Sequence, residues 1–230
     1  MDRIVEITHK HKSSHLGSCI TSYPILDFIY KTKSPNDICI LSSGHGGLAQ
    51  YVILEKYENK NAEYLYNKHG IHPHRDVENG IYVSSGSLGS AITVAVGYAV
   101  AKPENTIHVI ISDGECGEGS VWEALRYSRK LKNLKIHVNI NGYSAYDTIN
   151  IIELCTKIKL FNWRNTILWF TECPYIEGLQ AHYHVINDSD KDKIIKSINE
   201  KTVCGYSFPY YAKRFTDIFI NCGYGLWNSR

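Results

Sequence analysis

The sequence predicts an α/β protein in which helices cover both faces of a parallel β-sheet, giving three layers. Short runs rich in β-branched residues alternate with helix-like stretches along the chain, and this alternation is typical of parallel sheets. The chain is 43% hydrophobic and 21% charged, as in a packed globular protein. No Pro/Gly-rich linker divides residues 1–230, so we expect a single domain.

Five short apolar runs are the expected strands. Runs of this length and composition are typical of strands that are buried on both faces. In chain order they cover residues 37–41, 107–111, 135–140, 166–171 and 183–186.

Five further stretches are the expected helices. The stretch 88–102 is rich in Ala and Val, which predicts a well-buried helix. Trp122, Leu125 and Arg129 share one helical face because they stand at i, i+3 and i+7. The complete set covers residues 23–31, 46–57, 88–102, 121–131 and 190–198. Residues 201–230 are rich in aromatic side chains and lack a clear period, so we treat them as a divergent C-terminal segment.

The charge balance and the cysteines limit the class of protein. The net charge of +2 gives no general support for binding to nucleic acid or to a membrane. No run approaches the ~18 apolar residues of a membrane span, and residues 1–17 lack an apolar signal-peptide stretch. The seven cysteines include no C-x-x-C pair, which argues against a disulfide framework and a thiolate zinc site. We therefore expect a cytoplasmic protein that binds neither nucleic acid nor membrane.

The strongest chemical signal lies between residues 111 and 147. Asp113, Gly114 and Glu115 follow an expected strand, at the edge of a parallel sheet where ligands bind. A helix is expected to begin nearby, and the next strand ends at Asn141, so this amide can converge with the Asp113 carboxylate. Oxygen ligands beside a helix N-terminus suit Mg²⁺ or Ca²⁺ holding a phosphate. A turn that is merely rich in Asp, Gly and Asn remains the alternative.

Three other patterns favour structural interpretations. Cys116 lies among glycines and carboxylates and is a candidate nucleophile, but a small residue in a tight loop is the favoured interpretation. His72-x-His74 and His182-x-His184 each offer two possible zinc ligands. Simple alternation along a strand or loop is the favoured interpretation of both pairs.

Four ordered segments of the chain resemble the transketolase family. The pattern SDGE…EG…WEA…NL…N-x-N-G in residues 112–142 resembles the thiamine diphosphate signature of that family. SSHLG at 13–17 resembles S-G-H-P-G, and LSSGHGGLAQY at 41–51 resembles L-S-x-G-H. Residues 72–101 resemble the block containing H-P and G-S-L-G. The resemblance covers roughly residues 8–200, and its specificity comes from the order of the four blocks.

The resemblance implies the thiamine diphosphate-binding fold, with this chain as its diphosphate-binding domain. Asp113, Asn141 and the carbonyl of Tyr143 would ligate Mg²⁺ (or Ca²⁺), which would bridge the two phosphates. The remaining cofactor-binding residues would be Gly86, Ser87, Leu88, Gly114 and Glu115, with Asn141 also counted among them.

The resemblance also assigns catalytic roles. His15, His45 and His72 would lie near the reactive thiazolium carbon and the substrate hydroxyls, and Glu118 would join a carboxylate network across a subunit interface. Ketol transfer needs proton movement at sugar hydroxyls, which imidazoles perform near neutral pH, while thiamine acts as the electron sink. The chain departs from the family where Ser112 replaces the first glycine of G-D-G and Leu16 replaces the proline of S-G-H-P-G.

The matched blocks correspond to one half of a transketolase active site. The family's second domain holds the aminopyrimidine and supplies the glutamate that activates the cofactor, and no segment here resembles it. We therefore predict the N-terminal subunit of a two-subunit transketolase-like enzyme, active with a C-terminal pyrimidine-domain subunit in an α₂β₂ assembly. Its reaction would be two-carbon ketol transfer between sugars or sugar phosphates. The alternatives are a deoxyxylulose-phosphate-synthase-like or nucleotide-sugar-specific carboligase, and a non-catalytic thiamine diphosphate-binding regulatory subunit.

Overall fold

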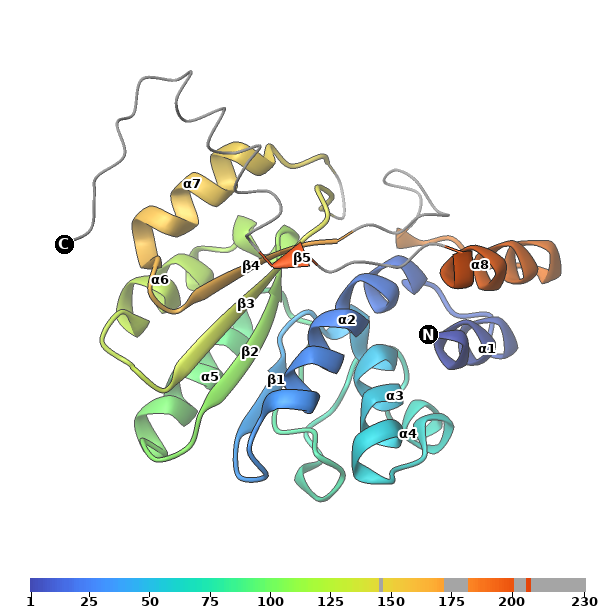
Figure 1. Cartoon of the computed structure of the whole chain (residues 1–230), viewed down its shortest axis with the longest axis horizontal. Helices are drawn as coiled ribbons and strands as arrows, with labels where there is room; N and C mark the ends of the chain where they lie inside the picture. The colour runs from blue at the N-terminus through green and yellow to red at the C-terminus, as the bar shows by residue number, and fades with distance from the viewer. Residues whose placement is uncertain (145–146, 172–181, 201–205, 208–230) are drawn as a thin grey trace.

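A five-stranded sheet lies at the centre of the computed structural model, which describes residues 1–144, 147–171, 182–200 and 206–207 (Figure 1). The strands are neighbours in chain order, and the first four are parallel. Their bounds are β1 (Ile38–Leu41), β2 (Ile107–Ser112), β3 (Leu134–Ile140), β4 (Thr166–Phe170) and β5 (Tyr206–Ser207). The first four predicted strands are thereby confirmed to within one residue at each end.

Two features of the sheet differ from the prediction. Residues 183–186 form no strand. Only Ile186 of this run is buried, and Asn187 directly after it caps the next helix by accepting a hydrogen bond from the N–H of Asp190 at 2.9 Å. The sheet is also not wholly parallel, because β5 pairs with β4 in the antiparallel direction. β5 is the part of segment 201–230 that the structure describes, so the single-domain organisation of residues 1–230 stays a prediction.

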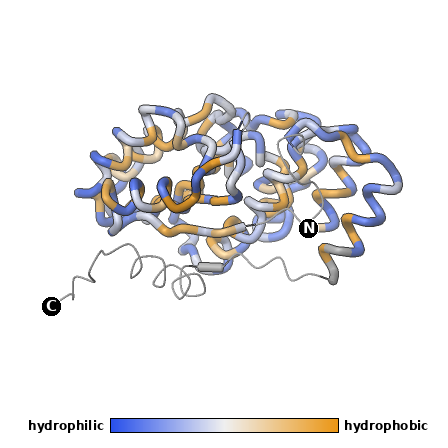
Figure 2. Tube along the Cα trace, turned by 90° about the horizontal axis from the view of Figure 1, so that it is seen from above, coloured by the Kyte–Doolittle hydropathy of each residue, from blue (hydrophilic) through white to orange (hydrophobic). Residues whose placement is uncertain are grey.

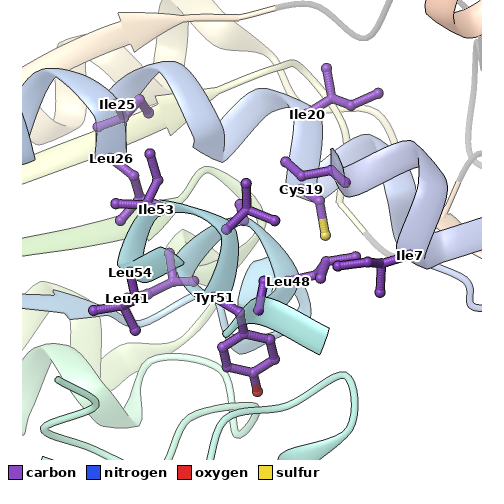
Figure 3. Close-up of a cluster of buried hydrophobic side chains, with 14 of the residues drawn as sticks. Ile7, Cys19, Ile20, Ile25, Leu26, Leu41, Leu48, Tyr51, Ile53 and Leu54 are labelled. Atoms are coloured by element: carbon purple, nitrogen blue, oxygen red, sulfur yellow. The ribbon is translucent and has the colours of Figure 1, made fainter. Parts of the chain in front are cut away.

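Five helices share the hydrophobic core on one face of the sheet. They are α1 (Asp2–Lys10), α2 (Leu16–Thr32), α3 (Gly47–Glu58), α4 (Ala62–His69) and α8 (Asp188–Glu200). Cys39, Leu41 and Ile110 point from the strands into this first core, in which Leu41 lies near Leu54 of α3 (Figure 3). Burial of these aliphatic side chains provides the main stabilisation of the layer.

The opposite face packs against α5 (Ser90–Ala101), α6 (Gly119–Ser128) and α7 (Ile151–Asn162). Ile40, Val109 and Val138 point into this second core, since successive strand residues face opposite sides. Along the helices hydrophobic residues alternate with hydrophilic ones (Figure 2), as expected where one helical face packs inward. The predicted three-layer α/β architecture is confirmed.

The helices extend beyond the predicted set. α1, α4 and α7 were not expected, and α2 begins at Leu16 rather than at residue 23. Pro24 lies inside α2, where an α-helix loses one backbone hydrogen bond, yet the buried residues before and after it hold the helix together. Among the described residues, no helix is long and apolar enough to cross a membrane.

The connection between β1 and β2 moves the chain from one face of the sheet to the other. α3 and α4 contribute to the first core, whereas α5 contributes to the second. Residues 70–89 link α4 to α5 and contain the short 3₁₀ helix η2 (Val77–Asn79). Because α5 leads into the beginning of β2, its own N-terminus lies at the carboxyl edge of the sheet. Residues 70–89 therefore arrive at this edge together with η1 (Gly44–Gly46) and η3 (Gly114–Gly117), which follow β1 and β2.

Candidate active site

The carboxylate of Asp113 lies at the end of β2 and is almost fully buried. Its Oδ2 accepts hydrogen bonds from the N–H groups of Asn141 at 2.8 Å and Gly142 at 2.7 Å, and its Oδ1 accepts one from Gly114 at 3.0 Å. Burial raises the pKa of Asp113 to about 6, although these three hydrogen bonds act in the opposite direction. The sequence argument that brought Asp113 and Asn141 together is confirmed by this geometry.

The turn after β3 presents further oxygen atoms. The Oδ1 of Asn141 accepts a hydrogen bond from the N–H of Tyr143 at 2.9 Å, and Gly142 has a φ of +86°, which favours glycine. The carbonyl oxygen of Tyr143 lies 3.8 Å from the position of a Cβ built on Gly114. A carboxylate and a carbonyl oxygen thus lie beside the backbone of Gly114, with the amide oxygen of Asn141 in the adjoining turn, and hard divalent cations prefer this set of donors.

Two observations test whether a cation fits there. In the part of the chain that the structure describes, no basic side chain neutralises Asp113; its pKa responds to burial and to backbone hydrogen bonds. The described residues also contain no group of three or more His, Cys, Asp or Glu side chains with metal-binding geometry. A cation at this edge would therefore take Asp113 with neutral oxygen ligands, which suits Mg²⁺ or Ca²⁺ rather than zinc.

A glycine-rich loop packs against the end of β1. Gly86 has a φ of +126°, and a Cβ built on it would lie 2.9 Å from Cδ2 of His72. A Cβ on Gly44 would lie 2.5 Å from the backbone nitrogen of Gly86. Both glycines are required for this close approach. Ser87 is exposed and Leu88 is half-buried, so both lie at the accessible side of the loop.

Two buried hydroxyl groups in these loops lack a partner among the described residues. They are the Oγ atoms of Ser43 and Ser85. Buried hydroxyls in folded proteins are normally hydrogen-bonded, so each such atom requires an explanation. The backbone around Gly44 connects them, because a Cβ on Gly44 would lie 2.7 Å from the Ser85 Oγ. Unused hydrogen-bonding capacity at this position fits a site that receives a polar ligand.

Four imidazole rings gather at the same edge. The ring centroid of His15 lies 6.2 Å from that of His45, 6.0 Å from that of His72 and 4.2 Å from that of His182. The rings of His45 and His182 are 5.6 Å apart. We call these four residues the site cluster. The structure brings together the three histidines that the motifs singled out, and it adds His182.

His182 was missed as a site residue. Its only sequence signal was the pair His182-x-His184, and this pair separates in space. The Nε2 of His184 lies within hydrogen-bonding distance of a carboxylate oxygen of Asp190, at 3.0 Å, outside the site cluster. His72 and His74 also separate, since the His74 ring lies 6.2 Å from the ring of His69. The two members of each pair therefore have different neighbours in the described structure.

The pKa values of His15, His45 and His182 are lowered by their surroundings. Burial and the neighbouring histidines lower the pKa of His15 to about 4 and that of His45 to about 3, and burial lowers the pKa of His182. His15 adopts a φ of +69°, and its N–H donates to the carbonyl of His182 at 3.0 Å. Its Nδ1 lies 2.6 Å from the Oγ of Ser14. Neutral imidazoles near pH 7 can accept and donate protons.

The remaining candidates occupy different environments. Glu115 is fully buried, whereas Glu118 is exposed and directly precedes α6. Glu118 packs near Gly89, since a Cβ on that glycine would lie 2.8 Å from the Cβ of Glu118. Cys116 is buried, its Sγ donates to the carbonyl of Ser112, and burial raises the pKa of its thiol well above the ordinary value. A buried, protonated thiol is inert, which favours the structural interpretation of Cys116.

Comparisons with known proteins give the family. Residues 2–170 match the N-terminal family model of 1-deoxy-D-xylulose-5-phosphate synthase. The enzyme of that name from Fusobacterium nucleatum is 26% identical over 94% of this chain and 36% of its own length. One of the subunits of apulose-4-phosphate transketolase from Phocaeicola vulgatus is 31% identical over 70% of this chain and 66% of its own length. 6-Deoxy-6-sulfo-D-fructose transketolase subunit SqwG from a Clostridium species is 37% identical over 55% of this chain and 52% of its own length.

Solved structures have the same fold. Transketolase from Leishmania mexicana has a TM-score of 0.68 at 19% identity and covers 86% of this chain and 40% of its own. A Pichia stipitis transketolase has a TM-score of 0.58 at 20% identity, and the match covers 89% of this chain and 33% of the transketolase chain. This chain spans between 36% and 66% of the length of the three curated relatives named above. Because the family model matches well over half of its residues, the chain belongs to the family of 1-deoxy-D-xylulose-5-phosphate synthase N-terminal domains, which are thiamine diphosphate-binding and transketolase-like.

Proposed function

We propose that the chain is the N-terminal subunit of a two-subunit enzyme that transfers two-carbon ketol groups between sugars or sugar phosphates with thiamine diphosphate. The observation that carries this proposal is the gathering of four imidazole rings at the sheet edge that also holds the Asp113 carboxylate. The rings that would transfer protons and the carboxylate that would anchor the cofactor then lie at the same edge of the sheet. Two relatives are themselves named as single subunits of transketolases, which supports the division into subunits.

The oxygen atoms after β2 and β3 suit the metal and the diphosphate. Asp113, Asn141 and the Tyr143 carbonyl would hold Mg²⁺ or Ca²⁺, and Gly114 would allow the diphosphate to approach the backbone. Gly86, Ser87 and Leu88 would line the cofactor, and the unpartnered hydroxyls of Ser43 and Ser85 support a polar ligand in this position. When bound, thiamine diphosphate supplies a carbanion and an electron sink.

The histidines would manage protons at the substrate hydroxyls. His15 and His45 are neutral at pH 7, as their lowered pKa values require, so each can accept a proton as a general base and return it. His72 is the exposed ring of the three, and its exposure supports a role in meeting the incoming sugar. His182 would share this role because its ring packs against that of His15.

The partner would supply the pyrimidine side of the cofactor site, in an α₂β₂ assembly. Glu118 is exposed beside the glycine-rich loop, as a residue in a carboxylate network between subunits would be. We also propose a cytoplasmic location. Cys39, Cys116 and Cys155 are free thiols buried in the fold, which fits a reducing compartment.

The cofactor assignment is tested by titration calorimetry of the whole chain with thiamine diphosphate and Mg²⁺, alone and with a candidate pyrimidine-domain subunit. We expect binding by the unmodified chain and by the control Asp192→Ala, which changes an exposed carboxylate on α8, and at least a hundredfold weaker binding by Asp113→Ala. Absence of binding in both conditions, or an unchanged Asp113→Ala variant, overturns the assignment.

The reaction is tested with the same proteins. Ketol transfer between two sugar phosphates is expected only when both subunits are present. Transfer by the single chain overturns the partner requirement. Condensation of pyruvate with glyceraldehyde 3-phosphate in place of ketol transfer overturns the reaction in favour of deoxyxylulose-phosphate synthesis.

A further inference from the structure

Glu115 is a buried carboxylate that bonds to three separate segments of the site. Its Oε1 accepts a hydrogen bond from the hydroxyl of Ser42 at 2.6 Å and another from the N–H of Gly89 at 3.0 Å. Its Oε2 accepts from the N–H of Ser112 at 3.0 Å. The three donors come from the end of β1, the end of the glycine-rich loop and the end of β2.

Each of these donors stands next to a residue of the candidate site. Ser42 precedes the segment that carries Ser43 and His45, Gly89 closes the loop that carries Gly86, and Ser112 precedes Asp113. The Glu115 carboxylate is therefore hydrogen-bonded to three segments of the candidate site. They are the loop that carries His45, the glycine-rich loop and the strand end that carries Asp113.

The environment of Glu115 sets it apart from an ordinary core residue. It is 0% exposed, and within the described residues it forms no ion pair, since its partners are the serine hydroxyl and the backbone N–H groups. Burial of a carboxylate is costly unless hydrogen bonds replace its hydration, and hydrogen bonds to a charged group are the strong ones. These bonds use both oxygens of Glu115 inside the protein.

We infer that Glu115 is a positioning residue: it holds the three loops of the cofactor site in register through its hydrogen bonds, and its carboxylate does not itself bind the cofactor or the metal. This inference rests on the proposed function, because it concerns the shape of the diphosphate side of that site. It replaces the direct cofactor contact that the family resemblance implied for Glu115.

The first test is the isosteric variant Glu115→Gln. In one orientation of the amide its NH₂ group faces the N–H of Gly89, and in the other it faces the N–H of Ser112. Two donors cannot pair, so one of these hydrogen bonds is lost in either case. Calorimetry of the whole chain with thiamine diphosphate and Mg²⁺ should show roughly 10- to 100-fold weaker binding, the usual cost of losing a residue that orients ligating groups. The matched control is Glu123→Gln on α6, an exposed carboxylate paired with Arg126, which should bind as the unmodified chain does.

A second variant keeps the carboxylate and removes one donor. Ser42→Ala deletes the hydroxyl that donates to Glu115 and should weaken cofactor binding several-fold, less than Glu115→Gln. Urea unfolding of each variant separates positioning from stability. Positioning predicts weaker binding at a temperature where circular dichroism shows a fully folded variant. A merely structural role predicts a lower free energy of unfolding with unchanged affinity of the folded protein.

The outcomes separate this inference from the proposed function. If the unmodified chain binds the cofactor and the folded Glu115→Gln and Ser42→Ala variants bind equally well, the positioning role is wrong and the proposed function stands. If Glu115→Gln does not fold, unchanged binding by Ser42→Ala is sufficient to overturn the inference. If the unmodified chain itself does not bind, the proposed function fails.

Discussion

Two groups of close histidines in the described part of the chain differ in what their ring nitrogens do. One is the site cluster at the carboxyl edge of the sheet. The other, which we call the core pair, consists of His108 on β2 and His137 on β3, both buried. Their rings stack 5.3 Å apart. Burial lowers the pKa of His108 to about 4 and that of His137 to about 3, as it lowers those of His15 and His45 in the site cluster.

The core pair has a fixed pattern of hydrogen bonds. The indole N–H of Trp169 lies 3.0 Å from Nδ1 of His137, and Nε2 of His137 lies 3.1 Å from Nδ1 of His108. Because an indole nitrogen only donates, His137 accepts at Nδ1, carries its proton at Nε2 and donates to His108. Each of these ring nitrogens has a partner, and the pair lies inside the sheet.

The ring nitrogens of the site cluster differ from those of the core pair in their hydrogen bonding. Across the described residues, the ring nitrogens of His45, His72 and His182 have no hydrogen-bond partner, and His72 is exposed. Proximity and a lowered pKa are common to both groups, so these two properties do not by themselves identify a reactive site. Unused hydrogen-bonding capacity at an accessible edge is the property that distinguishes them.

The largest expected effect is on activity in the site cluster. We expect His72→Ala to reduce ketol transfer, measured with the partner subunit, by roughly 10²- to 10⁴-fold, because it removes a proton-transferring group. The free energy of unfolding should change by less than about 0.5 kcal/mol, as is usual for an exposed side chain. The control is His184→Ala outside the cluster. Full activity of His72→Ala would show that this ring does not take part in the chemistry.

For the core pair we expect a loss of stability rather than a loss of activity. His137→Ala leaves the indole N–H of Trp169 unpaired and creates a cavity, so the free energy of unfolding measured with urea should fall by about 3 kcal/mol. Thiamine diphosphate affinity of the folded protein should remain within twofold. A loss of stability below about 1 kcal/mol would contradict the importance of the hydrogen-bonded chain.

The core pair also predicts a dependence of stability on pH. The pKa of His108 is about 4 in the fold, against an ordinary value of 6.5. The unfolded chain therefore binds the proton first, and stability falls as the pH decreases from about 6.5 towards 4, by at most about 3 kcal/mol for this group.

Other groups contribute in the same pH range, so a difference between proteins is the useful measurement. His15 and His45 act in the same direction as His108. Asp113, with its raised pKa of about 6, acts in the opposite direction, because it stabilises the fold at low pH and loses this contribution as the pH rises through 6. Urea unfolding at several pH values should show a shallower acid dependence for His108→Gln than for the unmodified chain. Identical slopes would refute the assignment to His108.

The smallest expected effects concern two glycines. Gly86→Ala places a Cβ 2.9 Å from the ring of His72 at a φ of +126°, and should reduce the free energy of unfolding by about 1–3 kcal/mol. Gly97 lies inside α5, where a Cβ would meet nothing within 4 Å. Gly97→Ala should therefore raise the free energy of unfolding by up to about 1 kcal/mol. Equal changes in the two variants would show that packing around His72 is looser than the distances indicate.

The sequence was informative where structure depends on neighbouring residues or on adjacent strand ends. The four parallel strands could be predicted because each is short and rich in β-branched and other apolar residues. Asp113 and Asn141 could be placed together because β2 and β3 are neighbours, with Ser112 opposite Asn139.

The missed elements lack such local signals. α4 buries only Ala62 and Leu65 among its eight residues, which is too few to show a period. In α7 the large apolar residue Leu160 is 73% exposed, so its apolar residues do not lie on one face. His182 reaches the site cluster through tertiary packing, and the two-residue strand β5 depends on its pairing with β4, so neither has a pattern of its own.

The crossing of the chain between β1 and β2 separates the two halves of the site. His15 and His45 are anchored to helices of the first core, whereas Asp113 leads into η3 and α6 of the second. The two halves therefore rest on different hydrophobic cores, and we expect hydrogen exchange of each half to report on the opening of its own core. Residues 70–89 connect the two halves along the chain, and the hydrogen bonds from Ser42, Gly89 and Ser112 to Glu115 connect them in space.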